Sequence, residues 1–146
     1  MGVGSMTTRG TGEARLIRIA RFRASHHYRR AEWSEEENRR VFGAQAEPHA
    51  HDWRVEVHVA GPVDPRTGWC VDLSVLDGAL REAMAGWEGG DLNVLIPEVT
   101  RGEITPSTEN LARWLHARLA GGLPGPARVV EVRVFESDEL GSAWPA

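Results

Sequence analysis

The sequence contains no lysine and a single cysteine among its 146 residues. Without lysine, the chain has no amine for Schiff-base chemistry and no lysine anchor for phosphate groups. With Cys70 alone, it forms no intrachain disulfide and no thiolate metal cluster. No apolar run reaches the roughly 20 residues that span a bilayer, and 21 acidic residues outnumber 17 basic ones. These absences argue against membrane and nucleic-acid partners, and we expect a cytoplasmic protein.

The remaining composition predicts one domain behind a short tail. Residues 1–14 lack an apolar core, so we expect a disordered tail there and no signal peptide. Residues 15–146 are long enough for a single domain with its own core. Strand-like alternation marks residues 16–26, 49–59, 127–136 and, more weakly, 140–144, and helical spacing marks residues 35–42, 73–87 and 106–119. This order predicts an α+β fold, ββααββ, with an antiparallel four-stranded sheet and two helices on one face.

Polar residues before the helical segments are expected to cap them: Ser34, Asp72 and Thr105. In the strand over 49–59, alternation places His58 on the polar face, where we expect it to be in solvent. In the strand over 127–136, Val130 and the valines at alternate positions share a face with Glu136. A carboxylate that closes an apolar stripe needs partners if it is buried.

Three histidines are spaced so that they can share one metal ion. His49 and His51 are two residues apart, so in a strand their side chains point to the same face. That face continues into the apolar stripe of the strand, and His26 ends the apolar stripe of the preceding strand. Three imidazoles with one open position form the ligand set of a catalytic zinc site. The spacing therefore predicts a Zn²⁺ site at His26, His49 and His51.

Six motifs between Leu16 and the C-terminal strand, in order, resemble the 6-pyruvoyltetrahydropterin synthase and 6-carboxytetrahydropterin synthase family. They are Phe22–His26, Glu36–Asn38 with Phe42 and Gly43, His49–Trp53, Asp64–Gly68, Ser107–Asn110 and Val134–Ser137. The resemblance implies a T-fold, in which subunits pair their sheets into a barrel. A homohexamer or trimer with active sites between subunits is implied as well, and this agrees with the need to cover exposed sheet edges.

The resemblance also implies a ligand set. Zinc is held in the family by the positions that match the three histidines, and the small-molecule substrate is dihydroneopterin triphosphate. Glu136 matches the glutamate that anchors the pterin ring, and Ser107 and Thr108 match a second pair that contacts substrate.

The catalytic residues of the family are the ones that this chain lacks. Gln45 stands at the position of the catalytic cysteine, and an amide cannot act as a thiolate base, so we count Gln45 as a substrate-binding candidate. Gly89 replaces the catalytic histidine, and Glu88 its partner aspartate. Some family members use a glutamate in place of the cysteine. Three carboxylates are therefore candidates for the missing base: Glu47, Glu88 and Asp91.

Together these features predict a zinc-dependent, lyase-like enzyme with altered catalytic residues. Its substrate is expected to be a small oxygenated molecule, such as an intermediate of specialised metabolism. The protein is expected to act as a homo-oligomer. One alternative is a non-catalytic paralogue that binds a pterin-like ring on Glu136. Another is residual 6-pyruvoyl- or 6-carboxytetrahydropterin synthase activity through Glu47 or Glu88.

Overall fold

The computed structural model describes residues 12–146 and is built on one antiparallel sheet of four strands. The strands lie side by side in chain order: β1 (Ala14–His26), β2 (His49–Gly61), β3 (Arg128–Ser137) and β4 (Leu140–Trp144). The register pairs His26 at the end of β1 with His49 at the start of β2. The predicted four-stranded antiparallel sheet is thus confirmed, including its short fourth strand.

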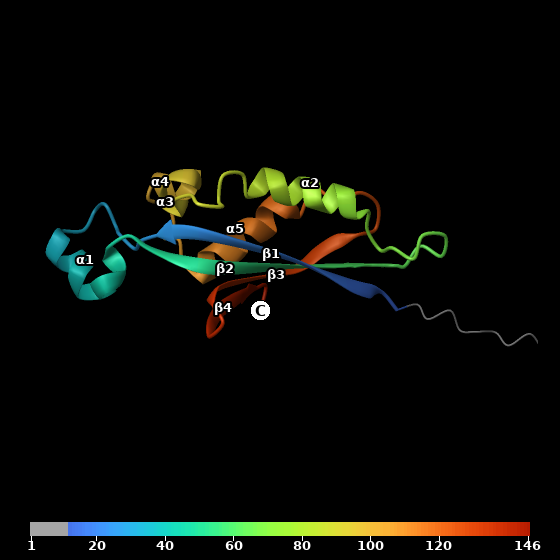
Figure 1. Cartoon of the computed structure of the whole chain (residues 1–146), viewed down its shortest axis with the longest axis horizontal. Coiled ribbons are helices and arrows are strands. Elements are labelled where there is room, and N and C mark those ends of the chain that lie inside the picture. The colour runs from blue at the N-terminus through green and yellow to red at the C-terminus, as the bar shows by residue number, and fades with distance from the viewer. Residues whose placement is uncertain (1–11) are drawn as a thin grey trace, which may run out of the picture.

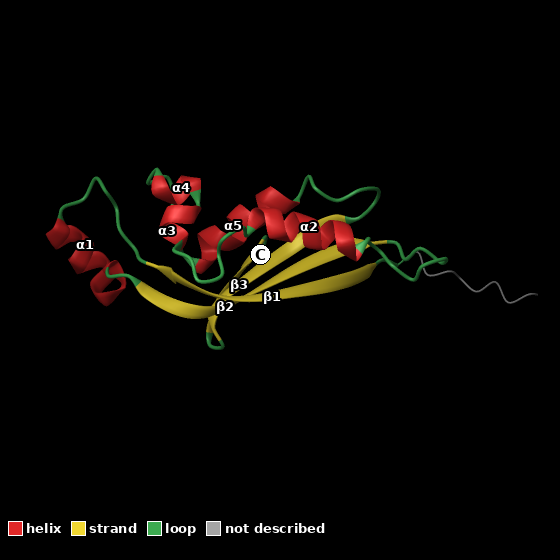
Figure 2. Cartoon of the chain, turned by 45° about the horizontal axis from the view of Figure 1, so that its top comes forward, coloured by secondary structure: helices red, strands yellow, loops and turns green. Residues whose placement is uncertain are grey.

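Two helices cover one face of this sheet (Figure 2): α2 (Leu73–Ala83) and α5 (Thr108–Leu119). The helix α1 (Glu35–Phe42) and the 3₁₀ turn η1 (Gly43–Ala46) connect β1 to β2 and lie beyond the end of the sheet (Figure 1). Near the same end lie α3 (Leu92–Leu95) and α4 (Pro97–Thr100). The two-helix layer confirms the predicted fold class, whereas η1, α3 and α4 had no sequence prediction.

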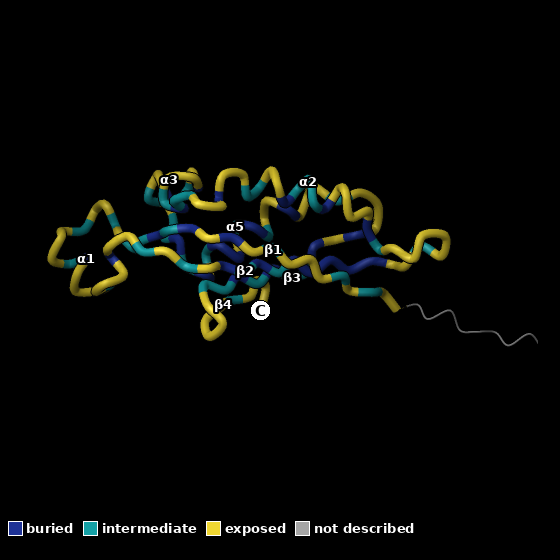
Figure 3. The backbone as a smooth tube through the Cα atoms, viewed as in Figure 1, coloured by how far each residue is buried: buried dark blue, intermediate teal, exposed yellow. Residues whose placement is uncertain are grey.

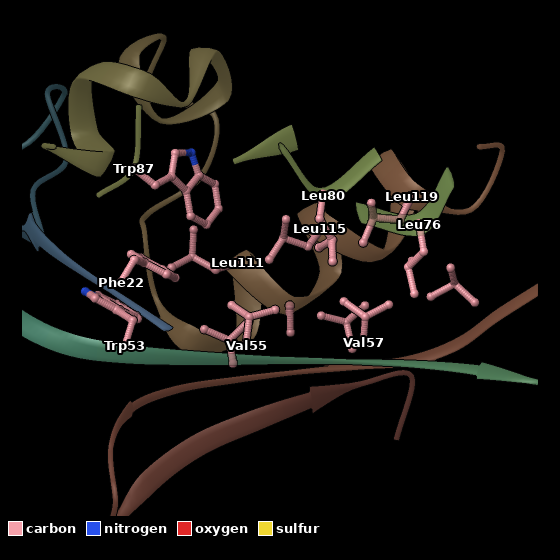
Figure 4. Close-up of a cluster of buried hydrophobic side chains, with 14 of the residues drawn as sticks. Phe22, Trp53, Val55, Val57, Leu76, Leu80, Trp87, Leu111, Leu115 and Leu119 are labelled. Carbon is pink, nitrogen blue, oxygen red and sulfur yellow. The ribbon is translucent and has the colours of Figure 1, made fainter. Parts of the chain in front are cut away.

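The core lies between the sheet and these two helices, and Figure 4 shows its side chains. Leucines from α2 and α5 face valines from β2, all of them buried: Leu76, Leu80, Leu111, Leu115, Leu119, Val55, Val57 and Val59. Each such side chain stabilises the fold by roughly 1.5–3 kcal/mol when it is fully buried. Towards α1 the core ends in Phe22 and Trp53, whose rings stack with centroids 6.0 Å apart. This packing fixes the ends of β1 and β2 that carry the histidines.

Both ends of the molecule are largely exposed (Figure 3). The turns over residues 62–70 are largely exposed, as is most of α1, while buried residues follow the strands and the inner sides of α2 and α5. None of the helices within residues 12–146 is both long and apolar enough to cross a membrane.

The N-terminal prediction is only partly covered by the structure. Residues 1–11 of the expected tail lie outside the described residues. The first strand begins at Ala14, two residues before the predicted start, and Glu13 forms an ion pair with Arg128 at 2.7 Å. The domain therefore includes residues that the sequence pattern assigned to the tail.

Two of the three predicted helix caps are confirmed, and the third is wrong. Ser34 and Asp72 accept hydrogen bonds from the first turns of α1 and α2. The last helix, α5, is capped by Ser107, whose hydroxyl accepts the backbone N–H of Asn110 at 3.1 Å. Thr105 lies outside the helix, and its carbonyl accepts the Asn110 side-chain amide at 2.9 Å. This shift leaves the carbonyl before Ser107 free to reach the candidate site.

Two predicted side-chain orientations are also wrong. A register shift opposite His58 inserts one extra residue in β3, so Val129 is buried in the core instead of Val130. His58, expected in solvent, is 2% exposed. Its ring lies between the carboxylates of Glu56 at 3.2 Å and Glu131 at 3.9 Å, on the sheet face away from the helices. Long side chains on neighbouring strands cover it, which a single-strand pattern does not indicate.

Candidate metal centre

Three imidazoles converge where β1 ends and β2 begins. His26 is the last residue of β1, and His49 and His51 are the first and third residues of β2. One ring nitrogen from each lies within 4.8 Å of the other two. The ring centroids are 4.5 Å apart for His26 and His49 and 4.9 Å apart for His49 and His51. The structure thus brings the three predicted ligands together, while metal binding itself stays a prediction.

Backbone carbonyls fix the orientation of two of these rings. Nδ1 of His26 lies 2.8 Å from the carbonyl oxygen of Pro106, and Nδ1 of His49 lies 2.8 Å from that of Glu47. A carbonyl oxygen only accepts hydrogen bonds, so each Nδ1 carries the proton and each Nε2 carries a free lone pair. Metal-binding histidines usually have such a partner on the second nitrogen.

Burial favours the neutral form of His26 and His51, as metal ligation requires. The His26 side chain is fully buried, and this desolvation lowers its pKa to about 4, although the Pro106 carbonyl acts in the opposite direction. Burial also lowers the pKa of His51. Nε2 of His26 and Nε2 of His51 are buried without a hydrogen-bond partner. Unsatisfied buried lone pairs are costly unless something binds them, so the residues fit a zinc ion, whose preferred ligands include imidazole nitrogens.

One carboxylate approaches this group. Oε2 of Glu136, near the end of β3, lies 3.8 Å from Nε2 of His26 and 3.8 Å from Nε2 of His51. Within residues 12–146, no arginine forms an ion pair with Glu136, and the neighbouring Arg54 pairs with Glu56 instead. Its predicted position beside the site is therefore seen, and its binding of substrate is untested.

Tyr28, the single tyrosine of the chain, also lies at the site and had no sequence prediction. Its ring is 5.2 Å from that of His26 and stacks on Phe42 at 5.6 Å, which ties α1 to the sheet. Burial raises the pKa of Tyr28 to about 12, with further contributions from the charges of Glu136 and Glu109. The hydroxyl therefore keeps its proton. No motif marked this residue; its rarity was the only signal.

The candidate residues before the histidine pair present their backbone to the site. Gln45 lies in η1 with its side chain exposed, and its carbonyl accepts the backbone N–H of Tyr28 at 2.9 Å. Glu47 is also exposed, and its contact with His49 is through its carbonyl. Among the described residues, neither side chain makes a hydrogen bond or an ion pair with the imidazoles, so their roles stay predictions.

The other two candidate bases are used in local structure. Glu88 is exposed, and its Oε2 accepts the backbone N–H of Arg23 at 2.9 Å. Asp91 caps α3 by accepting the backbone N–H of Asn93 at 2.9 Å. Within one subunit the structure does not bring either carboxylate to the three histidines. A catalytic role for them stays untested.

Ser107 and Thr108 lie at the start of α5, next to the Pro106 carbonyl that orients His26. Ser107 is the N-cap of α5, as described above. Thr108 is buried, and its hydroxyl lies 2.7 Å from that of Ser142 on β4. Their observed hydrogen bonds are structural, and their predicted contact with substrate is untested.

With this geometry in place, comparison with known proteins identifies the class of the chain. The family model described as 6-pyruvoyl tetrahydropterin synthase matches residues 15–143. The chain therefore belongs to the 6-pyruvoyl tetrahydropterin synthase family, as its motifs suggested, and this is a family of pterin-metabolism enzymes.

Several characterised relatives extend over nearly the whole chain. Human 6-pyruvoyl tetrahydrobiopterin synthase is 32% identical over 139 residues, covering 91% of this chain and 94% of its own. The protein of the same name from Poecilia reticulata is 32% identical over 127 residues, covering 85% and 84%. Dihydroneopterin monophosphate aldolase from Pyrococcus furiosus is 28% identical over 133 residues, covering 88% and 95%.

Solved structures support the T-fold. Caenorhabditis elegans 6-pyruvoyl tetrahydropterin synthase superimposes with a TM-score of 0.82 at 20% identity, covering 92% of this chain and 96% of that one. The Plasmodium vivax synthase gives a TM-score of 0.61 at 15% identity, covering 90% and 96%. At such identities the likeness concerns the fold alone.

Proposed function

We propose that this protein is a zinc-dependent enzyme of lyase type that acts on the side chain of a small oxygenated substrate. A pterin is the first candidate for this substrate. The observation that carries the proposal is the convergence of three imidazoles, two of which donate their Nδ1 proton to a backbone carbonyl, together with two Nε2 atoms that are buried without a partner. A bound cation would give the unpartnered ring nitrogens a partner. The family, moreover, consists of enzymes of pterin metabolism.

A zinc ion at this site would polarise a carbonyl or hydroxyl group of the substrate and lower its pKa. His26, His49 and His51 would hold it, with the Pro106 and Glu47 carbonyls keeping two of the rings in position. The chain itself supplies two polar groups beside them. The Glu136 carboxylate can accept a proton, and the Tyr28 hydroxyl, with its raised pKa, can donate a hydrogen bond without ionising.

The absence of the family's cysteine shapes the proposed chemistry. Gln45 cannot remove a proton, so a carboxylate must do so, and we expect elimination or aldol-type cleavage instead of a reaction that needs a thiolate. The relative named an aldolase, at 28% identity, supports this direction. We further propose that the active form is a homo-oligomer with its sites between subunits. At each site, Glu88 or Asp91 of a neighbouring subunit would reach the substrate.

A second function is favoured by one observation. Gln45 and Gly89 stand where the resemblance places the catalytic side chains. A protein that binds a pterin ring beside Glu136 without converting it would retain the site and lose these groups. Ligand binding without product distinguishes this alternative from an enzyme.

The test is a turnover assay with the zinc-loaded protein and three pterins: dihydroneopterin, its monophosphate and its triphosphate. We expect mass spectrometry to show loss of phosphate or cleavage of the side chain for at least one of them, and His51→Gln to abolish it. Binding of all three by the wild type, with no product, would contradict an enzyme of pterin chemistry and favour the binding protein.

A further inference from the structure

Glu136 is placed against two metal-ligand candidates in a way that a substrate anchor alone does not require. Its Oε2 is 3.8 Å from Nε2 of both His26 and His51, and its side chain is only 15% exposed. β3 pairs with β2, and Phe135 lies opposite Arg54, so Glu136 projects on the same face as the histidines. The carboxylate therefore approaches the atoms that would bind the ion.

The side-chain atoms that face each other here make no hydrogen bond. The Pro106 carbonyl holds the proton of His26 on Nδ1, which leaves a lone pair on Nε2, 3.8 Å from a carboxyl oxygen of Glu136. A separation of 3.8 Å is too long for a hydrogen bond. Nε2 of His51 is likewise buried without a partner. A cation shared by Nε2 of His26, Nε2 of His51 and the Glu136 oxygen would give all three atoms a partner.

The spacing also suits a shared ion. Zinc binds nitrogen and oxygen at about 2.0–2.2 Å, so two ligands of one tetrahedral ion lie about 3.3 Å apart. The distances from Glu136 to His26 and His51, both 3.8 Å, are near this value and shorter than the 4.8 Å limit that encloses the three imidazoles. Glu136 does not belong to the group of ligand atoms that all lie within 4.8 Å of one another, so its side chain would have to move to join the three imidazoles on one ion.

We propose that Glu136 is the fourth zinc ligand when no substrate is bound, giving a site of three histidines and one carboxylate. The proposal rests on the proposed function, because it takes the three histidines as the metal site. It adds that the fourth position is occupied by a protein group and not by water. An incoming substrate oxygen must then replace the carboxylate or enlarge the coordination shell, and the displaced carboxylate is left beside the substrate.

The first experiment compares wild type, Glu136→Gln and Glu139→Gln, all loaded with Co²⁺ in place of zinc, by visible absorption spectroscopy. Glu139 is a matched control because it is exposed in the turn after β3. Zinc affinity is measured on the same proteins by competition with a chromogenic chelator. We expect Glu136→Gln to alter the Co²⁺ bands and to weaken zinc binding at least about tenfold, with Glu139→Gln like wild type. Unchanged bands and affinity in Glu136→Gln would overturn the proposal.

A second measurement needs no variant. In a crystal structure of the zinc-loaded wild type without substrate, we expect a Glu136 oxygen at about 2.0–2.2 Å from zinc. A water molecule in that position, with Glu136 turned away, would overturn the fourth-ligand proposal and leave the histidine site intact. A wild type that takes up neither zinc nor Co²⁺ would instead overturn the proposed function, so the two failures are distinguishable.

Discussion

At the scale of single residues, His26 acquires the properties of a metal ligand from neighbours that are distant in sequence. The sheet and Trp53 bury its ring, and a carbonyl 80 positions later in the chain accepts its Nδ1 proton. Burial favours the neutral form, and the carbonyl selects which nitrogen has the lone pair. The same residue placed on an exposed strand end would be a titrating surface group.

The lowered pKa of His26 makes the stability of the metal-free protein depend on pH. The folded imidazole stays neutral down to about pH 4, whereas the unfolded one has the ordinary pKa of 6.5. Between these values the unfolded chain binds more protons, so the free energy of unfolding falls as the pH falls through this window. Urea unfolding in excess chelator at about pH 7 and about pH 4.5 measures this loss. We expect a smaller loss in His26→Gln; equal losses in both proteins would contradict the assignment.

At this scale the sequence was a good guide to residue identity and a poor one to environment. The spacing of two residues was enough to place His49 and His51 on one face, because successive side chains in a strand point to opposite faces. It gave no information on the burial of His58, whose ring lies between Glu56 of its own strand and Glu131 of β3. Tyr28 was missed because its place depends on packing against α1.

At the scale of elements, the segment after α2 is attached to the free edge of β1. The backbone N–H of Ser25 donates to the carbonyl of Gly90 at 2.9 Å, and Glu88 accepts that of Arg23. Gly90 is required for this contact, because a Cβ atom there would lie 2.3 Å from the carbonyl oxygen of Gly86 and 2.5 Å from a methyl group of Leu95. The close approach of two backbones holds the segment beside the candidate site.

Two glycine substitutions test this packing. Gly90→Ala should destabilise the protein by about 1–3 kcal/mol, since the backbone must move to admit the methyl group. Gly78→Ala, inside α2, meets no atom closer than 4.0 Å and should stabilise by up to about 1 kcal/mol, because alanine favours helix. Thermal and urea unfolding of both variants measure the difference. A Gly90→Ala protein as stable as wild type would contradict the described approach.

The sequence predicted which segments are helices and strands more reliably than it predicted their caps and their register. Long periodic segments such as α1 and β2 fell within one or two residues of their predicted bounds. The start of α5 was misplaced because Thr105 and Ser107 are both good capping residues, and tertiary contacts decide between them. The sequence pattern placed Val130 in the core instead of Val129, because it does not reveal the bulge in β3. This bulge depends on the pairing of β3 with β2.

At the scale of the molecule, the sheet of residues 12–146 ends in two edges, at β1 and β4. The segment after α2 covers β1 only near Arg23 and Ser25. The earlier part of the strand presents Ile17 and Ile19, which are 50% and 41% exposed. Uncovered edges with apolar side chains favour pairing with another chain, which supports the proposed homo-oligomer.

A proline at the edge of β1 tests that assembly. Outward N–H groups recur every second residue, so Ile19, four positions before Arg23, also points its N–H away from β2. Ile19→Pro removes this donor without removing a bond to β2, and Ile19→Thr is the control that keeps it. Light scattering should show an oligomer for wild type and Ile19→Thr and a smaller species for Ile19→Pro. An unchanged mass for Ile19→Pro would contradict pairing at this edge.

The zinc content of the purified protein tests the central claim most directly. Elemental analysis after exposure to zinc and removal of excess should find about one ion per chain in the wild type. His116→Gln on α5, away from the three imidazoles, should match it, and His51→Gln should have lost most of its zinc. A wild type without zinc, or a His51→Gln protein with as much zinc as wild type, would contradict the account.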